Sequence, residues 1–292
     1  MCDFKLTEGI LPDQSNAINV IRFLKPHGLV IRDLGYFSID SLRMIESKLA
    51  NYLSRLPFGV NIYLTSTDIR PLDVPKYLEK MMKRGQKSIA FDIYIGKEER
   101  YKTTLIAGTV PPSVVAKRIN KYTKENGKKP SEGFKEWNGY TIFATNISLK
   151  MLTPIAIITL YKIRWQVELA FKDLKSNHQI DYIKGTSPER IESMIYGRLI
   201  TIAAVFIISG HLSARLDEGK EISVYKLTKF LKIENRLKGA IKNNTLDELL
   251  ILVEEHVEDV CKQVRSKKTT IQEILEVLTP PEIKEFDVAV NF

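Results

Sequence analysis

Apolar and polar residues follow two rhythms along this chain, one typical of strands and one typical of helices. A short apolar run, Leu29 to Arg32, lies between Gly28 and Asp33 and predicts a buried strand. Helical spacing follows over residues 39–53 and returns from about residue 154 to 177. Further strands are predicted between residues 62 and 146 by IYLTS, SIAFDIYIG, YKTTLIAGTV and GYTIFATN, with turn signals such as Glu125-Asn126-Gly127 between them. This order of elements predicts the α/β class.

The second half of the chain has a helical pattern. Ser187-Pro188-Glu189 is a signal for the start of a helix. The most apolar window, residues 199–210, is shorter than the roughly 20 residues that a membrane span requires, so it predicts a buried helix and no membrane association. Other predicted helices cover residues 15–23, 223–232, 245–264 and 270–278.

The amino-acid composition bears on the kind of binding partner. Lys and Arg total 44 against 35 Asp and Glu, a formal net charge of +9. This balance favours a polyanion such as DNA, although ribosomal, membrane-surface and merely basic soluble proteins share it. The lysines between Lys226 and Lys242 could line DNA, or they could form a solvated helical face. Cys2 and Cys261 have no metal-ligand spacing, and the start of the chain has no secretory signal, so a reduced cytoplasmic protein is expected.

The segment from Tyr161 to Lys175, YKIRWQVELAFKDLK, is the most informative in the sequence. At roughly 100° per residue, Tyr161, Arg164, Glu168 and Lys175 fall within an arc of about 60° on one helix face. The opposite side is apolar and is expected to be buried; it consists of Ile163, Val167, Ala170 and Leu174. Spacing alone also allows an ordinary solvated polar stripe.

The order and spacing of these four residues resemble the Y-R-E-K signature of bacterial insertion-sequence transposases, in the hairpin-forming, cut-and-paste branch of the DDE enzymes called insertion sequence family four. Trp165 after the Arg and the pair Phe171-Lys172 after the Glu agree with that family. So does Ala144-Thr145-Asn146, at the end of a predicted strand.

Two residues nearer the start extend the resemblance. Asp33-Leu34-Gly35-Tyr36-Phe37 resembles the second catalytic aspartate of the family and the Gly-Tyr-Phe after it. An Asp after a strand also often just caps the next turn. Arg55 stands where the family often carries an Arg at the end of the next strand.

The resemblance implies a ribonuclease-H-like catalytic core that a β-rich insertion subdomain interrupts, followed by a helical C-terminal region. The implied domains are residues 1–55 (partial core with Asp33), 56–147 (insertion), 148–215 (remaining core with the Glu168 helix) and 216–292 (helical region).

The resemblance also implies the chemistry, which is cleavage of DNA phosphodiesters and strand transfer. Two Mg²⁺ or Mn²⁺ ions bound by carboxylates supply this chemistry in the family. Asp33 and Glu168 would be two of the catalytic, metal-binding carboxylates. The implied partners are double-stranded DNA, as transposon ends and target, and a second copy in a homodimer, at the nucleoid in the bacterial cytoplasm. The implied DNA-binding residues are Tyr161, Arg164, Lys175, Lys172, Arg55 and Trp137.

The sequence allows two roles for the ring of Trp137. It or Tyr140 could stack on an unpaired base, a contact favourable by about 1–3 kcal/mol. Both rings could instead pack in the core of the insertion.

One departure from the family limits these expectations. The first catalytic Asp lies several dozen residues before the second in the family, but only 32 residues precede Asp33. Neither Asp3 nor Asp13 follows a suitable strand, so we expect the chain to begin inside the catalytic domain and to be inactive or nearly so by itself. The alternative function is a non-catalytic inhibitor that binds DNA or full-length transposase. A basic helical scaffold with a coincidental motif is a third interpretation.

Overall fold

The computed structural model describes residues 21, 23–82, 85–185, 187–214, 216, 220–263, 274 and 276. These residues divide into two compact units. One, the sheet unit, contains the described residues up to Arg164 together with Ile274 and Glu276, and the other, the helical unit, contains those from Trp165 to Gln263. The predicted helices at residues 15–23 and 270–278 lie almost entirely outside the described residues.

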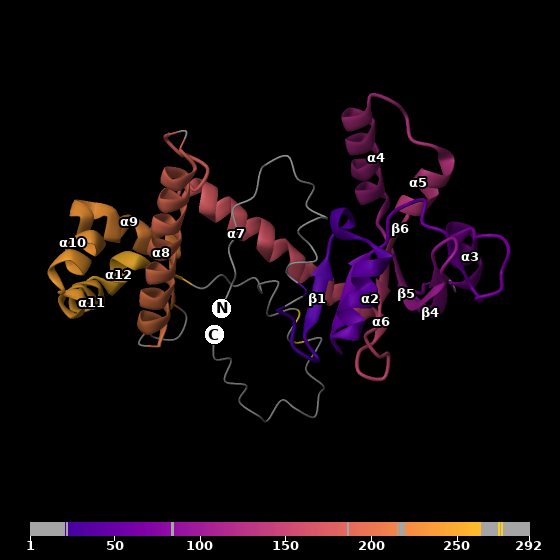
Figure 1. Ribbon diagram of the computed structural model, residues 1–292, viewed down its shortest axis with the longest axis horizontal. Helices are drawn as coiled ribbons and strands as arrows, with labels where there is room; N and C mark the ends of the chain where they lie inside the picture. The colour runs from indigo at the N-terminus through magenta and orange to yellow at the C-terminus, as the bar shows by residue number, and fades with distance from the viewer. Residues whose placement is uncertain are drawn as a thin grey trace. The chain divides into compact units, whose positions relative to one another are not determined.

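The sheet unit is built on one mixed sheet of six strands, in the order β1-β2-β6-β5-β4-β3 (Figure 1). The pair β1 and β2 is parallel, with Arg32 opposite Ser54, and all other pairs are antiparallel. Their bounds are β1 Leu29–Arg32, β2 Asn51–Arg55, β3 Ile62–Tyr63, β4 Ser88–Ile95, β5 Tyr101–Thr109 and β6 Tyr140–Thr145.

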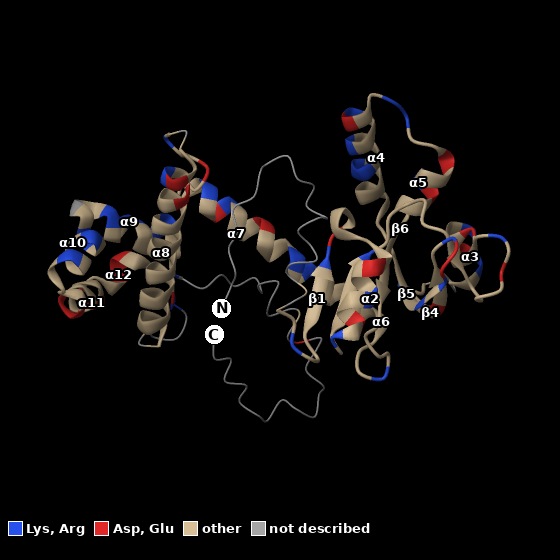
Figure 2. Ribbon diagram, viewed as in Figure 1, with Lys and Arg blue, Asp and Glu red and all other residues tan. Residues whose placement is uncertain are grey.

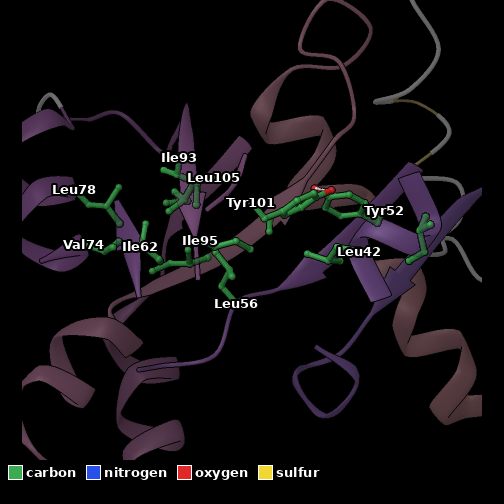
Figure 3. Close-up of a cluster of buried hydrophobic side chains, with 14 of the residues drawn as sticks. Leu42, Tyr52, Leu56, Ile62, Val74, Leu78, Ile93, Ile95, Tyr101 and Leu105 are labelled. Atoms are coloured by element: carbon green, nitrogen blue, oxygen red, sulfur yellow. Dashed lines mark hydrogen bonds between the residues drawn. The ribbon is translucent and has the colours of Figure 1, made fainter. Parts of the chain in front are cut away.

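Helices cover both faces of this sheet. Their bounds are η1 Leu34–Tyr36, α2 Ile39–Ser47, α3 Val74–Met81, α4 Pro112–Asn126, α5 Glu132–Asn138, α6 Pro154–Leu160 and η2 Tyr161–Ile163. On one face, side chains of α2, α3 and the strands form the larger core, in which Leu42, Tyr52 and Leu78 are fully buried (Figure 3). Tyr52 and Tyr101 meet there through their hydroxyls, 3.1 Å apart.

The opposite face carries a smaller core under α6. Leu53, Phe143 and Ile157 are buried in it. Helix α6 comes so close to β5 that a Cβ at Gly108 would lie 2.8 Å from Cδ1 of Ile158, so a larger residue at this crossing would require the Ile158 side chain to shift. This core supports the residues that follow α6.

The side chains of Thr145 and Asn146 join the end of β6 to the start of β2 through hydrogen bonds. The Thr145 hydroxyl donates to the carbonyl of Tyr52 (2.6 Å). The Asn146 side chain accepts from the Tyr52 amide (2.8 Å) and donates to the carbonyl of Ala50 (3.1 Å), as a neighbouring strand would. The structure thus gives the Ala-Thr-Asn motif a backbone-pairing role.

Replacing Asn146 with Asp is expected to lower the free energy of unfolding at neutral pH by about 1–3 kcal/mol. The carboxylate keeps the acceptor for Tyr52 but places a negative oxygen against the carbonyl of Ala50. Urea denaturation at pH 7 measures the loss, and part of the stability should return at acid pH, where the carboxyl regains a donor. The matched control is Asn120→Asp on the exposed surface of α4, expected to change stability by less than about 0.5 kcal/mol. Equal losses of unfolding free energy in both variants would contradict this role of the Asn146 side chain.

The helical unit packs short helices against the long helix α8. Val205, Ile208 and Leu212 on α8 are buried in a core with Leu227 of α9 and Val253 of α11. The bounds are α7 Arg164–Ser176, α8 Pro188–Ser213, β7 Lys220–Ile222, α9 Val224–Lys232, η3 Ile233–Asn235, α10 Arg236–Asn243, α11 Leu246–Glu255, α12 Val257–Val260 and β8 Cys261–Gln263.

By length and composition, α8 could cross a membrane, because the helix has 26 residues and extends well beyond the short window that the sequence singled out. A core helix of a soluble protein meets the same criteria. The side formed by Val205, Ile208 and Leu212 is buried as predicted, whereas Ile200 and Ile207 are 65% and 73% exposed.

Several predicted elements differ from the structure. The helix predicted over residues 39–53 ends at Ser47, and β2 starts at Asn51. The segment from 56 to 147 was expected to be mostly β, but it contains α3, α4 and α5 as well as β3 to β6. Gly127, in the expected turn signal, is the left-handed C-cap of α4 at φ 65°. The four strands of this segment continue the same sheet as β1 and β2. The four domain boundaries stay a prediction.

Candidate active site

Asp33 lies at the edge of the sheet where the parallel strands end. It follows β1 directly and caps η1, because its Oδ1 accepts a hydrogen bond from the amide of Leu34 (2.8 Å). Its side chain is 41% exposed. The capping role that the sequence allowed is therefore present, but it leaves the carboxylate accessible at an edge where sites commonly form in α/β sheets.

Tyr161 and Arg164 both reach this carboxylate. The Tyr161 hydroxyl donates to Oδ1 of Asp33 at 3.3 Å, across 128 residues of sequence. A guanidinium nitrogen of Arg164 lies 3.3 Å from Oδ2, and the side chain of Arg164 is 24% exposed. Two residues of the Tyr-Arg-Glu-Lys pattern thus meet the Asp that resembles the second catalytic aspartate of the family.

A change in helix type places Tyr161 and Arg164. The helix predicted over about residues 154–177 is present as three consecutive segments, because the 3-10 turn η2 lies between α6 and α7. This tighter turn shifts the phase of the residues that follow it. The ring of Tyr161 packs on buried Phe143, with centroids 4.6 Å apart, which directs its hydroxyl to the strand end.

Burial and the Asp33 charge raise the pKa of the Tyr161 phenol to about 12, while the Arg164 and Arg55 cations oppose the shift. The phenol is therefore a neutral hydrogen bond donor at physiological pH. The stability that its proton contributes is complete below the ordinary pKa near 10 and is lost as the pH rises through about 12.

Asp33→Asn is expected to lower the pKa of Tyr161 towards its ordinary value, because the negative charge beside the phenol disappears. Arg164→Gln should raise it, because an opposing positive charge is lost. NMR of ¹³Cζ-labelled tyrosine, with the resonance assigned by Tyr161→Phe, measures both shifts. Glu46→Gln, next to Tyr101, is the control and should leave Tyr161 unchanged. Shifts of the same sign in both site variants would contradict the arrangement.

Arg55 lies at the same edge of the sheet. Because β1 and β2 are parallel with Arg32 opposite Ser54, Asp33 and Arg55 are the next residues along the two strands. Each comes two positions after a residue of the core under α6, Ile31 or Leu53, so the alternation of side chains predicts the same face for both. The charge of Arg55 acts on Tyr161 and on Arg118. Arg55 thus lies at the strand edge that carries Asp33, and its role in DNA binding stays a prediction.

Arg118 was missed by the sequence reasoning. It lies on α4 and donates to the carbonyls of Asn138 (3.2 Å) and Tyr140 (3.0 Å) and to the Thr141 hydroxyl (3.0 Å). Burial and the nearby Arg55 cation lower the pKa of Arg118 to about 10, so it stays charged at neutral pH. No local signal marked this residue, because the helix that carries it was itself not predicted.

Glu168, Lys172 and Lys175 lie on later turns of α7, and all three are exposed. This part of α7 belongs to the helical unit, whereas Asp33 belongs to the sheet unit. The expected buried side of the helix is wrong for the described residues, because α7 has no buried residue and Val167 is 54% exposed.

Trp137 lies on α5 in an aromatic cluster with Phe58 and Phe134. The Trp137 and Phe58 rings meet edge to face with centroids 6.0 Å apart, and Phe58 and Phe134 meet at 5.5 Å. Trp137 and Tyr140 also pack against the larger core. Both rings therefore have the packing role that the sequence left open, and stacking on DNA stays a prediction.

The donor chemistry of this site fits only part of a divalent-cation site. The carboxylate of Asp33 offers hard oxygens suited to Mg²⁺ or Mn²⁺. The described residues contain no group of three or more His, Cys, Asp or Glu side chains that could hold a metal ion. Both Asp33 oxygens also have protein partners, so Arg164 would have to share or release Oδ2.

Comparisons with known proteins identify the family of the chain. Residues 3–204 match the family model described as Transposase DDE domain. The transposase for insertion sequence element IS231B of Bacillus thuringiensis subsp. berliner is 31% identical over 86% of this chain and 56% of its own length. The transposase for IS231E of B. thuringiensis subsp. finitimus is 29% identical over 94% of this chain and 62% of its own. That for IS1151 of Clostridium perfringens is 28% identical over 72% and 49%.

The chain thus spans roughly half to three fifths of these relatives. The chain has no significant match among solved structures. The mixed α/β sheet fits the ribonuclease-H-like fold of DDE transposases, a family that generally uses divalent metal ions. The family model covers more than half of the chain, and the chain belongs to the DDE transposase domain family of insertion-sequence transposases.

Proposed function

We propose that this chain carries the second catalytic aspartate and the catalytic glutamate of a DNA transposase in the Tyr-Arg-Glu-Lys branch. The supporting observation is the contact of Tyr161 and Arg164 with Asp33, because it joins both segments that resemble the family at one carboxylate. The reaction is cleavage of phosphodiesters at the ends of an insertion sequence, followed by strand transfer into target DNA. A homodimer at the bacterial nucleoid would carry it out.

Asp33 and Glu168 are the proposed ligands of two Mg²⁺ or Mn²⁺ ions, assigned by their match to the family motif. When bound, such ions activate the attacking oxygen and stabilise the leaving oxygen. Asp33 is suited to this role because it is exposed at the strand end. If Arg164 moved away from Asp33, Oδ2 of Asp33 would become available to a cation.

The cations around Asp33 are proposed to hold DNA phosphates. Arg164 can exchange its contact with Asp33 for a phosphate, which a guanidinium binds through two parallel hydrogen bonds. Arg55 adds positive charge at the same edge, and Tyr161 can donate to a phosphate oxygen as a neutral phenol. Lys172 and Lys175 would bind phosphates as point charges. Trp137 is proposed as a stacking residue only if its cluster opens.

A second candidate function is a non-catalytic product that binds DNA or a complete transposase and inhibits it. One observation favours this candidate. The described residues contain no group of three or more His, Cys, Asp or Glu side chains that could hold a metal ion. It would keep the basic surfaces and lack cleavage.

Cleavage of a plasmid that carries the element ends separates the two candidates. The transposase proposal predicts nicks at those ends that require Mg²⁺ or Mn²⁺ and disappear in Glu168→Gln. The assay uses residues 1–292 alone and also joined to the region that the relatives have in addition. Cleavage only by the joined form supports the expectation that this chain is inactive by itself. DNA binding without cleavage by either form would reject catalysis and leave the inhibitor.

A further inference from the structure

A groove in the helical unit combines positive charge with an apolar floor. It lies between α8, α9 and α10 and has a volume of about 490 Å³. Its floor is formed by apolar side chains, among them Val205, Leu231 and Leu237. No Asp or Glu is among the described residues that line it. Figure 2 shows Lys and Arg on α9 and α10, the two short helices of this groove.

Three lysines form the charged rim. Lys238 and Lys242 are one turn apart on α10, so their side chains project from the same face. Both are exposed, and neither makes a hydrogen bond or ion pair with any described residue. Lys232, at the end of α9, donates to the carbonyl of Asn177 at 2.7 Å and keeps two further N–H donors.

Two polar groups in the groove have unused hydrogen-bonding capacity. The hydroxyl of Thr228 has no partner among the described residues, although Thr228 is only 3% exposed. A buried hydroxyl without a partner is costly, so one in the wall of a groove indicates a missing polar contact. Asn235 also lines the groove, and its side chain makes no capping bond to α10.

We infer that this groove of the helical unit binds the sugar–phosphate backbone of DNA. Charge complementarity identifies the occupant, since the charged side chains that line the groove are all cations among the described residues, and DNA carries a negative charge at every phosphate. The lysines contact phosphates, Asn235 and Thr228 bond to backbone oxygens or to a bridging water, and the apolar floor lies against the sugars. Such contacts position a duplex without reading its sequence.

The inference rests on the proposed function only in the choice of DNA as the polyanion. It requires neither Glu168 nor bound metal, so it can be tested without cleavage. The test measures the affinity of the full chain carrying Glu168→Gln for a short fluorescein-labelled duplex of arbitrary sequence, by anisotropy over a series of salt concentrations.

The double variant Lys238→Gln with Lys242→Gln is expected to bind more weakly and to lower the slope of log affinity against log salt by about one per lysine. The charge-matched control is Lys128→Gln with Lys129→Gln, two exposed lysines after α4. It should keep the parent slope. Thr228→Val should weaken binding without lowering the melting temperature, because it removes only the hydroxyl.

The remaining outcomes contradict the inference as a whole or one of its contacts. If the parent binds and the lysine pair keeps the parent slope, the groove assignment alone fails. If the pair changes self-association in light scattering and not the salt slope, the groove takes a second copy of this chain. A Thr228→Val protein with unchanged affinity removes the hydroxyl from the contact set. If the parent shows no DNA binding, the proposed function fails together with the groove.

Discussion

Replacing Glu168 with Gln is expected to reduce metal-dependent DNA cleavage by about 10³-fold or more, because ions held by carboxylates supply several kcal/mol of transition-state stabilisation and each 1.36 kcal/mol is worth tenfold in rate. The substitution keeps the size of the side chain and removes the charge that binds a cation. Affinity for DNA should stay the same or rise slightly, since a negative charge disappears near Lys172. Asp33→Asn should have an effect of similar size.

The rate is measured in the form that cleaves, whether residues 1–292 alone or joined to the additional region of the relatives. Manganese binding followed by electron paramagnetic resonance gives a second readout and should weaken in both variants. Glu192→Gln on α8 is the matched control, because it removes one exposed carboxylate from the same unit and should leave rate and manganese binding unchanged. A Glu168→Gln protein that cleaves at the parent rate would remove Glu168 from the mechanism.

Phe143→Ala is expected to lower the free energy of unfolding of the sheet unit by about 3–5 kcal/mol, the usual range for a large aromatic side chain deleted from a core. Phe143 is 1% exposed and packs in the core under α6. Since whole domains are stable by about 5–15 kcal/mol, this is a large part of the total. The ring of Tyr161 would also lose the surface that orients its hydroxyl towards Asp33.

Urea denaturation followed by far-ultraviolet circular dichroism measures this loss. Phe58→Ala is a suitable control, because Phe58 is 47% exposed and its removal should cost about 1 kcal/mol. Phe143→Leu should be intermediate and should leave the pKa of Tyr161 closer to its ordinary value than in the parent. A loss for Phe143→Ala no larger than for Phe58→Ala would show that this face of the sheet is not the support for the site.

Local signals predicted much of the fold and identified most candidate residues. The strand from Leu29 to Arg32 has the predicted bounds. Ser187 and Ser223 precede helices at the predicted positions. The sequence failed in the middle of the sheet unit, where α4 follows β5 directly. Its start has a proline but no side-chain cap, so a strong sequence signal for a helix was lacking.

The sequence by itself determined which residues resemble the family and in which order they occur. It could do so because the spacing of residues along a helix, and the residue that ends a strand, are properties of neighbouring residues. Only the tertiary structure decided that Tyr161 and Arg164 meet Asp33, that Asn146 serves as a piece of strand, and that Arg118 lies near Arg55. These contacts join residues far apart in the chain. They depend on sheet register and on the packing of whole elements, which residue patterns leave open, because a pattern fixes which face a side chain takes and not what it meets there.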